Sequence, residues 1–462
     1  MKTYLYMVFF LFAIMPPKGW AQARVLTLED CRAMALENNK QLGVAKVEQE
    51  VAANMRKSAR TKYLPRVNAI AGYVWTSREM SLLSDDQKTK LTNHQNDVLP
   101  LTSAVLDYIG NEIVTALRTD TRNVSGGAVT VTQPLFMGGA IVAANKMATI
   151  GMDIAANKTE ARRQNTLLNI DQAYWQVVSL RQKQKLAESF LELMRKLKSD
   201  VDRMIEEGVA TKGDGLAISV KVNEAEMAQR QVDDGLTLAK MLLCEICGMP
   251  VREQITLADE ECEDIAVKTD GTVADVEFAL QNRPELKVLE GSVNLSRQNT
   301  KVQKAGYMPQ VLLTGGYVAT NPNLLNGFEK KFGGFWNVGV MVRVPIWNWG
   351  DTKYKVRASK GATTIANLEL EEAREMVELQ VNQNAFRVEE AYKRMEMANA
   401  DIASANENLR MATVGFKEGY VSTTTVMEAH TAWLKAQSQK IDAAIDVTIS
   451  QAELQKALGN LK

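Results

Sequence analysis

The sequence is two copies of one unit, and this duplication constrains the fold more than any other feature. The segment 63–67 (YLPRV) recurs 244 positions later as 307–311 (YMPQV). Further along, the offset is 211, and 129–136 (VTVTQPLF) matches 340–347 (VMVRVPIW). A block of 120 residues, 129–248, aligns with the second copy without a gap. Any fold assigned to one half must therefore be built twice.

The first copy is longer than the second between Trp75 and Val129. The change of offset corresponds to 33 extra residues there, and the added segment is polar. We expect it to form an enlarged surface loop.

Each copy reads in the same order, as a helix, a proline, a strand, a loop, a second strand, a proline, a very long helix, a tight turn and a returning helix. Neither long helix contains a proline, and at ~1.5 Å per residue each is about 100 Å long. Apolar residues at 4-3 spacing, such as Phe190, Met194 and Leu197, and Met395, Ala398 and Ile402, predict coiled-coil packing. We therefore divide the chain into 1–23, a signal peptide; 24–248, the first repeat, with strands 66–76 and 124–133, long helix 139–207 and returning helix 212–247; 249–271, a connecting equatorial segment; and 272–462, the second repeat, with strands 310–319 and 335–344, long helix 350–418 and returning helix 423–458.

The four strands alternate between apolar and polar residues. In 335–344 one face is Trp336 followed by four valines, and the other includes Asn337 and Arg343. In 66–76, Arg66 and Asn68 lie on the polar face. Strands of about ten residues with this pattern fit a membrane β-barrel with a polar lumen, although a sheet in a soluble sandwich has the same period. Four strands cannot close a barrel, so subunits would have to share one.

Prolines mark the helix-to-strand junctions. Proline lacks the N–H that both helices and sheets need, so it suits such a boundary. We expect Pro65 and Pro309 to end the helices that lead into strands, and Pro134 and Pro345 to end the strands that lead into the long helices.

A glycine-led turn joins each long helix to its returning helix. We expect Gly208 to adopt the left-handed conformation that ends a helix. Thr211 is then an N-cap, with Asp214 completing a capping box. The second turn has Gly419, Ser422 and Thr425, and so lacks the acidic residue.

The N-terminus predicts export. Lys2 precedes an apolar run, and Ala21-Gln22-Ala23 is a small-x-small cleavage pattern, so we expect the mature chain to begin at Arg24. The 55 basic and 55 acidic residues balance, which argues against nucleic-acid binding. With two histidines and no phosphate-binding glycine loop, we expect no catalytic residues, metal site or cofactor.

The duplicated Leu/Met-Pro strand entries, the V-x-V-x-x-P-[LI]-[FW] strand exits and the duplicated Glu-Gly turns resemble those of TolC-like outer-membrane efflux proteins. The resemblance covers the whole mature chain. It implies a mainly α fold with a membrane β-barrel portion, in which a homotrimer forms a 12-stranded barrel in outer-membrane lipid and a helical tunnel across the periplasm. The turns would form the entrance, gated by a periplasmic adaptor protein and an inner-membrane transporter. The residues assigned to adaptor docking and gating are Gly208, Val209, Ala210, Thr211, Asp214, Gly419, Tyr420, Val421, Ser422 and Thr425.

The resemblance implies the exit duct of a tripartite efflux pump or a type I secretion system, without enzymatic activity. It would conduct small toxic compounds or polypeptides. The alternative function is a periplasmic coiled-coil adaptor or scaffold.

The four cysteines, Cys31, Cys244, Cys247 and Cys262, are even in number and lie in a chain predicted to enter an oxidising compartment. The family places the first three in one equatorial belt, and we therefore expect at least one disulfide among the four.

Overall fold

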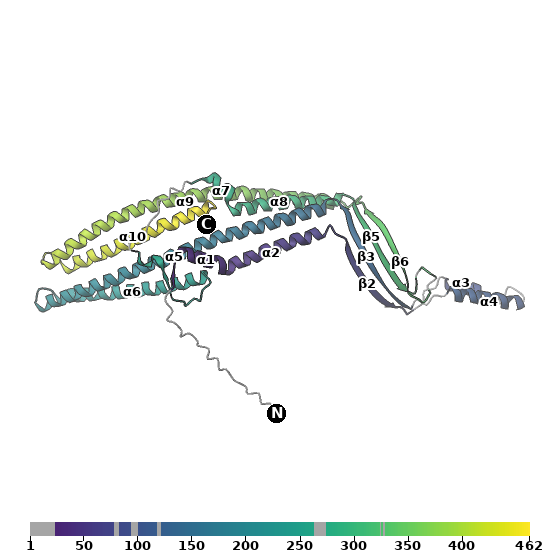
Figure 1. Ribbon diagram of the computed structural model, residues 1–462, viewed down its shortest axis with the longest axis horizontal. Coiled ribbons are helices and arrows are strands. Elements are labelled where there is room, and N and C mark those ends of the chain that lie inside the picture. The colour runs from purple at the N-terminus through teal and green to yellow at the C-terminus, as the bar shows by residue number, and fades with distance from the viewer. Residues whose placement is uncertain are drawn as a thin grey trace, which may run out of the picture. The chain divides into compact units, whose positions relative to one another are not determined.

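The computed structural model describes residues 24–77, 83–93, 100–117, 122–262, 274–323, 325–326 and 329–462. The predicted signal peptide lies outside the described residues. The first described strand begins at Arg24, the predicted mature N-terminus. The elements in chain order are β1 (Arg24–Leu26), α1 (Leu28–Asn38), α2 (Lys40–Thr61), β2 (Arg66–Trp75), α3 (Asp85–Thr92), α4 (Pro100–Ala116), β3 (Asn123–Met137), α5 (Ala140–Glu206), α6 (Lys212–Ile246), β4 (Ile255–Leu257), η1 (Ala258–Glu261), α7 (Val276–Asn282), α8 (Pro284–Lys304), η2 (Ala305–Tyr307), β5 (Gln310–Asn321), β6 (Gly333–Arg343), α9 (Asp351–Lys417) and α10 (Thr423–Ala457) (Figure 1).

The contacts divide the chain into two compact units that do not follow the sequence repeat. One unit contains residues up to 51, 153–292 and 367–462, and the other contains 52–152 and 293–366. Each unit therefore draws on both repeats. We call the first the helical unit and the second the sheet unit.

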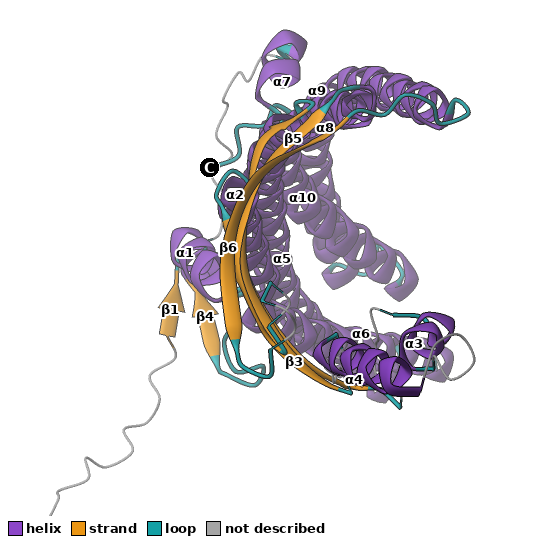
Figure 2. Cartoon of the chain, turned by 90° about the vertical axis from the view of Figure 1, so that its right-hand side faces the viewer, coloured by secondary structure: helices purple, strands orange, loops and turns teal. Residues whose placement is uncertain are grey.

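The sheet unit contains a four-stranded antiparallel sheet in the order β2-β3-β5-β6, which curves in Figure 2. The helices of this unit pack through small and hydroxyl-bearing residues. Thr300 and Ser359 are hydrogen bonded at 2.8 Å between α8 and α9. Asn145 of α5 donates its amide to the carbonyl of Ala59 in α2 at 2.9 Å. Such contacts let the helix backbones approach closely without large apolar side chains.

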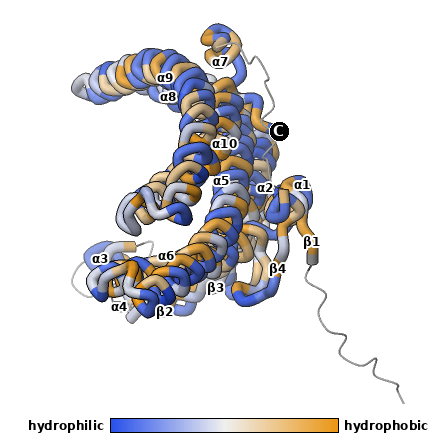
Figure 3. The backbone as a smooth tube through the Cα atoms, turned by 90° about the vertical axis from the view of Figure 1, so that its left-hand side faces the viewer, coloured by the Kyte–Doolittle hydropathy of each residue, from blue (hydrophilic) through white to orange (hydrophobic). Residues whose placement is uncertain are grey.

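Among its described residues, the helical unit has two large apolar clusters and a smaller one around Leu167, Leu168 and Leu461. The first joins α1, α5, α6 and the parallel pair β1-β4, and Tyr174, Val177 and Leu243 are fully buried within it. Beside this cluster, the guanidinium of Arg32 holds the buried carboxylate of Asp171 with two hydrogen bonds of 2.7 and 2.6 Å. Hydrophobic and hydrophilic residues are interspersed along α5 and α10 (Figure 3). No helix in the described part of the chain has the length and apolarity needed to cross a membrane.

Several expectations need correction. The predicted helix before each first strand is broken in two. Asn39 ends α1, and its side-chain oxygen accepts from the backbone N–H of Gln41 in the first turn of α2. In the second copy the break is at Arg283, before Pro284.

The insertion in the first copy is not only a loop, because it contains α3 and α4. The Ser84 hydroxyl accepts from Gln87 N–H in a capping box that begins α3.

The predicted disulfide is also wrong. None of the four cysteines, all within the described residues, forms a disulfide. Cys31, Cys244 and Cys247 are buried in the first apolar cluster, where they pack like small apolar side chains. Burial raises the pKa of the Cys244 thiol, and the hydrogen bond with Cys31 together with burial raises the pKa of Cys247. These thiols are therefore protonated at neutral pH, which disfavours oxidation.

Candidate functional site

The turn between α5 and α6 is closed by backbone hydrogen bonds and a side-chain cap. Gly208 has a φ of +78°, which ends α5. The N–H groups of Val209 and Ala210 both donate to the carbonyl of Met204, at 2.8 and 3.1 Å. Thr211 then caps α6 through its side chain, which accepts from the N–H of Asp214 at 3.2 Å. The chain thus reverses within a few residues.

The turn between α9 and α10 repeats this geometry 211 residues later. Gly419 has a φ of +80°, and the N–H groups of Tyr420 and Val421 both donate to the carbonyl of Gly415, at 2.8 and 3.2 Å. Ser422 caps α10 by accepting from the N–H of Thr425 at 3.3 Å. We call residues 208–214 the first tip and residues 419–425 the second tip.

Each tip presents one large exposed side chain at its outer end. Val209 is 70% exposed and Tyr420, at the matching position, is 88% exposed. The following residues, Ala210 and Val421, are half-buried. An apolar side chain that remains exposed at the end of a rigid hairpin is a candidate contact for a partner.

The two tips differ by an exchange of side-chain size. In the second tip Val421 lies over Gly415, where a Cβ atom would come within 2.5 Å of its side chain. In the first tip the matching positions are Ala210 and Met204, so the small residue is in the turn and the large one in the helix. Each tip therefore pairs one large residue with one small one, in opposite order.

The second apolar cluster lies directly behind the tips. It includes Phe190, Met194, Leu197 and Val201 of α5, with Met204 packed against it, which confirms the first stripe predicted from 4-3 spacing. Residues of α6, α9 and α10 complete it, among them Ile218, Phe416 and Val426. The two hairpins are thus held side by side in one core. In the second predicted stripe, Ala398 is buried, whereas Met395 and Ile402 are half-buried.

The cap of the first tip includes a titratable carboxylate, whereas the cap of the second uses two hydroxyl groups. The Thr211 hydroxyl donates to the Asp214 carboxylate at 2.6 Å and the Thr211 N–H donates to it at 3.0 Å. These hydrogen bonds lower the pKa of Asp214 below its usual value. An acid with a lowered folded-state pKa stabilises the fold above its unfolded pKa of about 4, and this contribution is lost as the pH falls through the folded pKa.

We expect acidification to loosen the first tip selectively. Amide exchange at residues 211–214, corrected for intrinsic rates, should accelerate as the pH is lowered below about 4, because protonated Asp214 no longer accepts both hydrogen bonds. The second tip, capped by two hydroxyl groups, is the internal control. In the variant Asp214→Asn, the amides of residues 211–214 should exchange quickly both above and below a pH of about 4. Equal acceleration at both tips would contradict this assignment.

The strand register places the four predicted lumen residues on one face of the sheet. Arg66 of β2 begins a cross-strand row that continues through Thr132 of β3 and Thr314 of β5 to Gly339 of β6. The row of Asn68 continues in the same way through Thr130 and Gly316 to Asn337. Arg343 lies on the same face as Asn337 and Gly339, because side chains alternate along a strand. The opposite face is mainly apolar. Two of its cross-strand rows reach β6 at Trp336 and Val338. The structure therefore brings Arg66, Asn68, Asn337 and Arg343 to one face.

Three of the four junction prolines lie outside strands. Pro65 precedes β2, Pro309 precedes β5, and Pro345 follows β6. Pro134 does not end its strand, because β3 continues to Met137 across a bulge between Pro134 and Phe136. On its other side, β3 pairs with β2 only up to Thr132, where β2 begins. The proline thus occupies the part of the strand where one neighbour is missing, as proline in a sheet requires.

Sequence reasoning missed one exposed aromatic pair. Trp349 has a φ of +53°, unusual for a residue with a side chain, and it packs edge to face on Trp347 with ring centroids 5.7 Å apart. Both are strongly exposed. The repeat aligns Trp349 with Gly138, whose φ is +60°. A glycine at the matching position of the first copy was the available signal that this backbone is left-handed.

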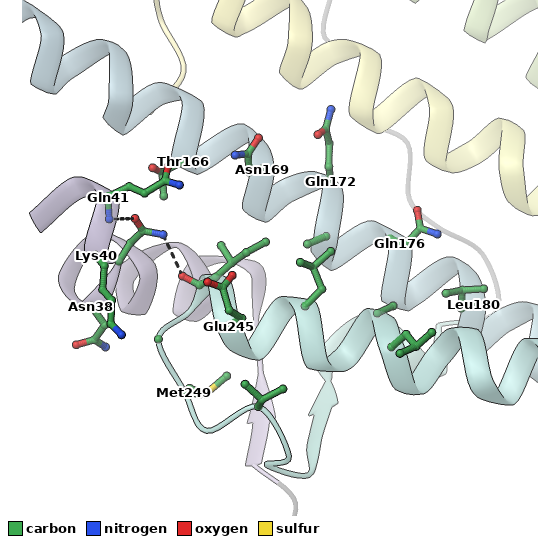
Figure 4. A pocket seen from close by; sticks show the side chains of 18 of the residues that line it. Asn38, Lys40, Gln41, Thr166, Asn169, Gln172, Gln176, Leu180, Glu245 and Met249 are labelled. Atoms are coloured by element: carbon green, nitrogen blue, oxygen red, sulfur yellow. Dashed lines mark hydrogen bonds between the residues drawn. The ribbon is translucent and has the colours of Figure 1, made fainter. Parts of the chain in front are cut away.

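A groove of about 1000 Å³ lies beside the ends of α1 and α6 in the helical unit (Figure 4). Leu238, Ala239 and Leu242 of α6 give it apolar lining, and Asn169 and Gln172 of α5 give it polar lining. Its lining includes only two charged residues, Lys40 and Glu245. The rest of the lining is uncharged, so the groove offers mainly a packing surface.

Comparison with known proteins places the whole architecture in context. A family model described as outer membrane efflux protein matches residues 32–248 and 276–460. The outer membrane protein TolC of Vibrio cholerae is 22% identical over 459 residues, which are 96% of this chain and 92% of the relative. The outer membrane efflux protein BepC of Brucella suis is 22% identical over 352 residues, 74% of each chain. The Campylobacter jejuni CmeC outer membrane channel has the same fold, with a TM-score of 0.77 at 15% identity over 94% of this chain and 85% of that one.

Proposed function

We propose that this chain, which belongs to the outer membrane efflux protein family, is the exit duct of a tripartite efflux pump or a type I secretion system. The general role of an outer-membrane efflux channel follows from the family. Within that role, we propose that the duct passively conducts small toxic compounds or polypeptides to the exterior. No step of passive conduction requires a catalytic residue or a cofactor.

The observation that carries the proposal is a sheet with no buried face. Within the strands β2, β3, β5 and β6 no residue is buried. Trp336, Val338, Val340 and Val342 of β6 all expose more than half of their surface. A single soluble chain would have to leave this apolar face and both sheet edges in water, which favours aggregation. The same feature argues against the alternative of a periplasmic adaptor.

Association of three copies accounts for both uncovered features. Joining β6 of one copy to β2 of the next would pair the edges and close twelve strands into one barrel. The apolar face would then contact outer-membrane lipid, and the polar face would line the lumen. Trp347 and Trp349, in the segment that follows β6, suit the membrane–water interface, where tryptophan is enriched.

The tips suit the role of a gated periplasmic entrance. Three copies with two tips each would place six rigid hairpin ends around one axis. The exposed Val209 and Tyr420 would offer contacts to a periplasmic adaptor protein, which couples the duct to an inner-membrane transporter. An adaptor that binds only separated tips would open the entrance, because a ligand shifts a two-state equilibrium by its differential affinity.

Native mass measurement of the mature protein in mild detergent tests the assembly. We expect three chains per particle, recovered from the outer-membrane fraction, and ion conductance after reconstitution into a planar bilayer. A stable monomer that remains inserted in the membrane would rule out the shared barrel. Water-soluble protein recovered without detergent would favour the adaptor alternative.

A further inference from the structure

The four strands of the sheet carry only two charged residues, and both are arginines. Arg66 is in β2 and Arg343 is in β6, and β2, β3, β5 and β6 contain no aspartate, glutamate or lysine. This contrasts with the whole chain, in which acidic and basic residues are equal in number. The charge that remains on the sheet is therefore entirely positive.

Both arginines lie at the same end of the sheet and on the same face. Arg66 is the first residue of β2 and Arg343 is the last of β6, next to the junction prolines Pro65 and Pro345. The row of Arg66 crosses β6 at Gly339, four residues before Arg343. At ~3.3 Å per residue, the two charges are separated by about 13 Å along the strand direction. Their neighbours on this face are uncharged and include Thr132 and Thr314 in the row of Arg66, and Gln310 and Met341 beside Arg343.

Neither guanidinium is neutralised by a carboxylate within the described residues, and both side chains are exposed. Some exposed arginines on helices have such partners, as in the pairs Arg374–Glu290 at 2.9 Å and Arg162–Glu48 at 3.0 Å. The strand arginines thus keep their full charge. A guanidinium is always charged and presents a planar set of donors that matches carboxylate and phosphate oxygens.

The two arginines occupy the two edge strands, β2 and β6. If three copies join edge to edge, as the proposed function requires, β6 of one copy pairs with β2 of the next. Arg343 of one copy then lies on the strand beside the one that carries Arg66 of the next copy. Six guanidinium groups would then surround the lumen near the end where strands meet helices. Positive charge gathered in a channel with low-dielectric walls raises the local concentration of anions.

We infer that Arg66 and Arg343 form an anion-binding ring in the lumen, which takes solutes bearing phosphate or carboxylate groups. This inference rests on the proposed function and adds a charge preference to it. The ring would favour the passage of anionic solutes, and it would hold multivalent anions long enough to obstruct the lumen.

The test is block of single-channel conductance by inorganic tripolyphosphate. Full-length trimers are reconstituted in a planar bilayer of neutral lipid, and the probe is added to each side in turn. We expect block at 0.1 M KCl that fades at 1 M KCl, where the screening length falls from about 10 Å to about 3 Å. In the double variant R66Q/R343Q the blocking concentration should rise by about tenfold or more, because charge-assisted hydrogen bonds are lost.

The double variant R66K/R343K is the matched control. It keeps the charge but loses the planar donors, so we expect block of intermediate strength. Wild-type channels that conduct but show no block would overturn the inference, and so would block that persists unchanged in R66Q/R343Q. A third contrary result combines two observations: tripolyphosphate does not block the channel, and R66Q/R343Q loses binding to vesicles with anionic lipid. That result would place the arginines against lipid phosphates. Failure of the wild type to form conducting trimers is seen before any probe is added, and it would refute the proposed function itself.

Discussion

Variants with aspartate at Ala210 or at Val421 are expected to abolish export while trimers still assemble and insert in the outer membrane. Both side chains are half-buried within the turns. A carboxylate there has to remain hydrated, so it would separate the tip from a partner surface or from a neighbouring tip. Neither residue is in a strand. Ala210 lies outside the second apolar cluster, and the partly buried Val421 packs against that cluster from the turn without being part of its buried core, so assembly should survive.

The measurement is an export assay beside a native trimer assay for each variant. Ala210→Ser and Val421→Thr serve as controls, because they add a polar atom of similar size without charge. We expect export to remain close to wild type in the controls and to fall to background in the aspartate variants. Full export by both aspartate variants would mean that the entrance and the docking surface lie elsewhere.

The second large effect is expected from a charge on the apolar face of the sheet. Val338 is 67% exposed in the single chain, and its neighbour Asn337 points to the opposite, polar face. Arginine on the lipid face of a membrane barrel costs about 2–4 kcal/mol near the bilayer midplane. In a trimer the cost of Val338→Arg would be incurred three times, so we expect almost complete loss of folded protein from the outer membrane.

Asn337→Arg is the matched control, since it places the same side chain one residue away on the polar face. We expect it to insert and trimerise normally. Quantifying folded trimer in isolated outer membranes compares the two variants directly. Equal insertion of both would show that the apolar face of β6 does not contact lipid.

Features encoded by local sequence were the ones that could be predicted. The capping box of Thr211 and Asp214 depends on residues three apart, and the stripe through Phe190 and Met194 depends on a short period, so each can be read from one segment. The polar face of the strands was also predictable, because alternation requires only the strand itself. The register that aligns Arg66 with Gly339 through two intervening strands was not, since it depends on pairing between distant segments.

The missed features depend on contacts that are distant in sequence or on strand neighbours. The parallel pair β1-β4 joins Arg24–Leu26 to Ile255–Leu257, and three residues are too few to show a period. Pro134 was expected to end a strand, but a proline is tolerated where the neighbouring strand has not yet begun. The cysteines were expected to form a bridge because of their compartment, whereas three of them belong to a packed apolar core.

The opposite order of large and small residues in the two tips has an evolutionary consequence. After duplication, the pairs Met204/Ala210 and Gly415/Val421 can converge only if both members change together. A side chain at position 415 alone would meet Val421, and alanine at position 421 alone would leave space over Gly415. Such pairwise dependence, in which the effect of one substitution is set by another, makes each single step at the second tip unfavourable. The two hairpin ends of each copy are therefore held apart as distinct surfaces, free to specialise for different partners or for different faces of one partner.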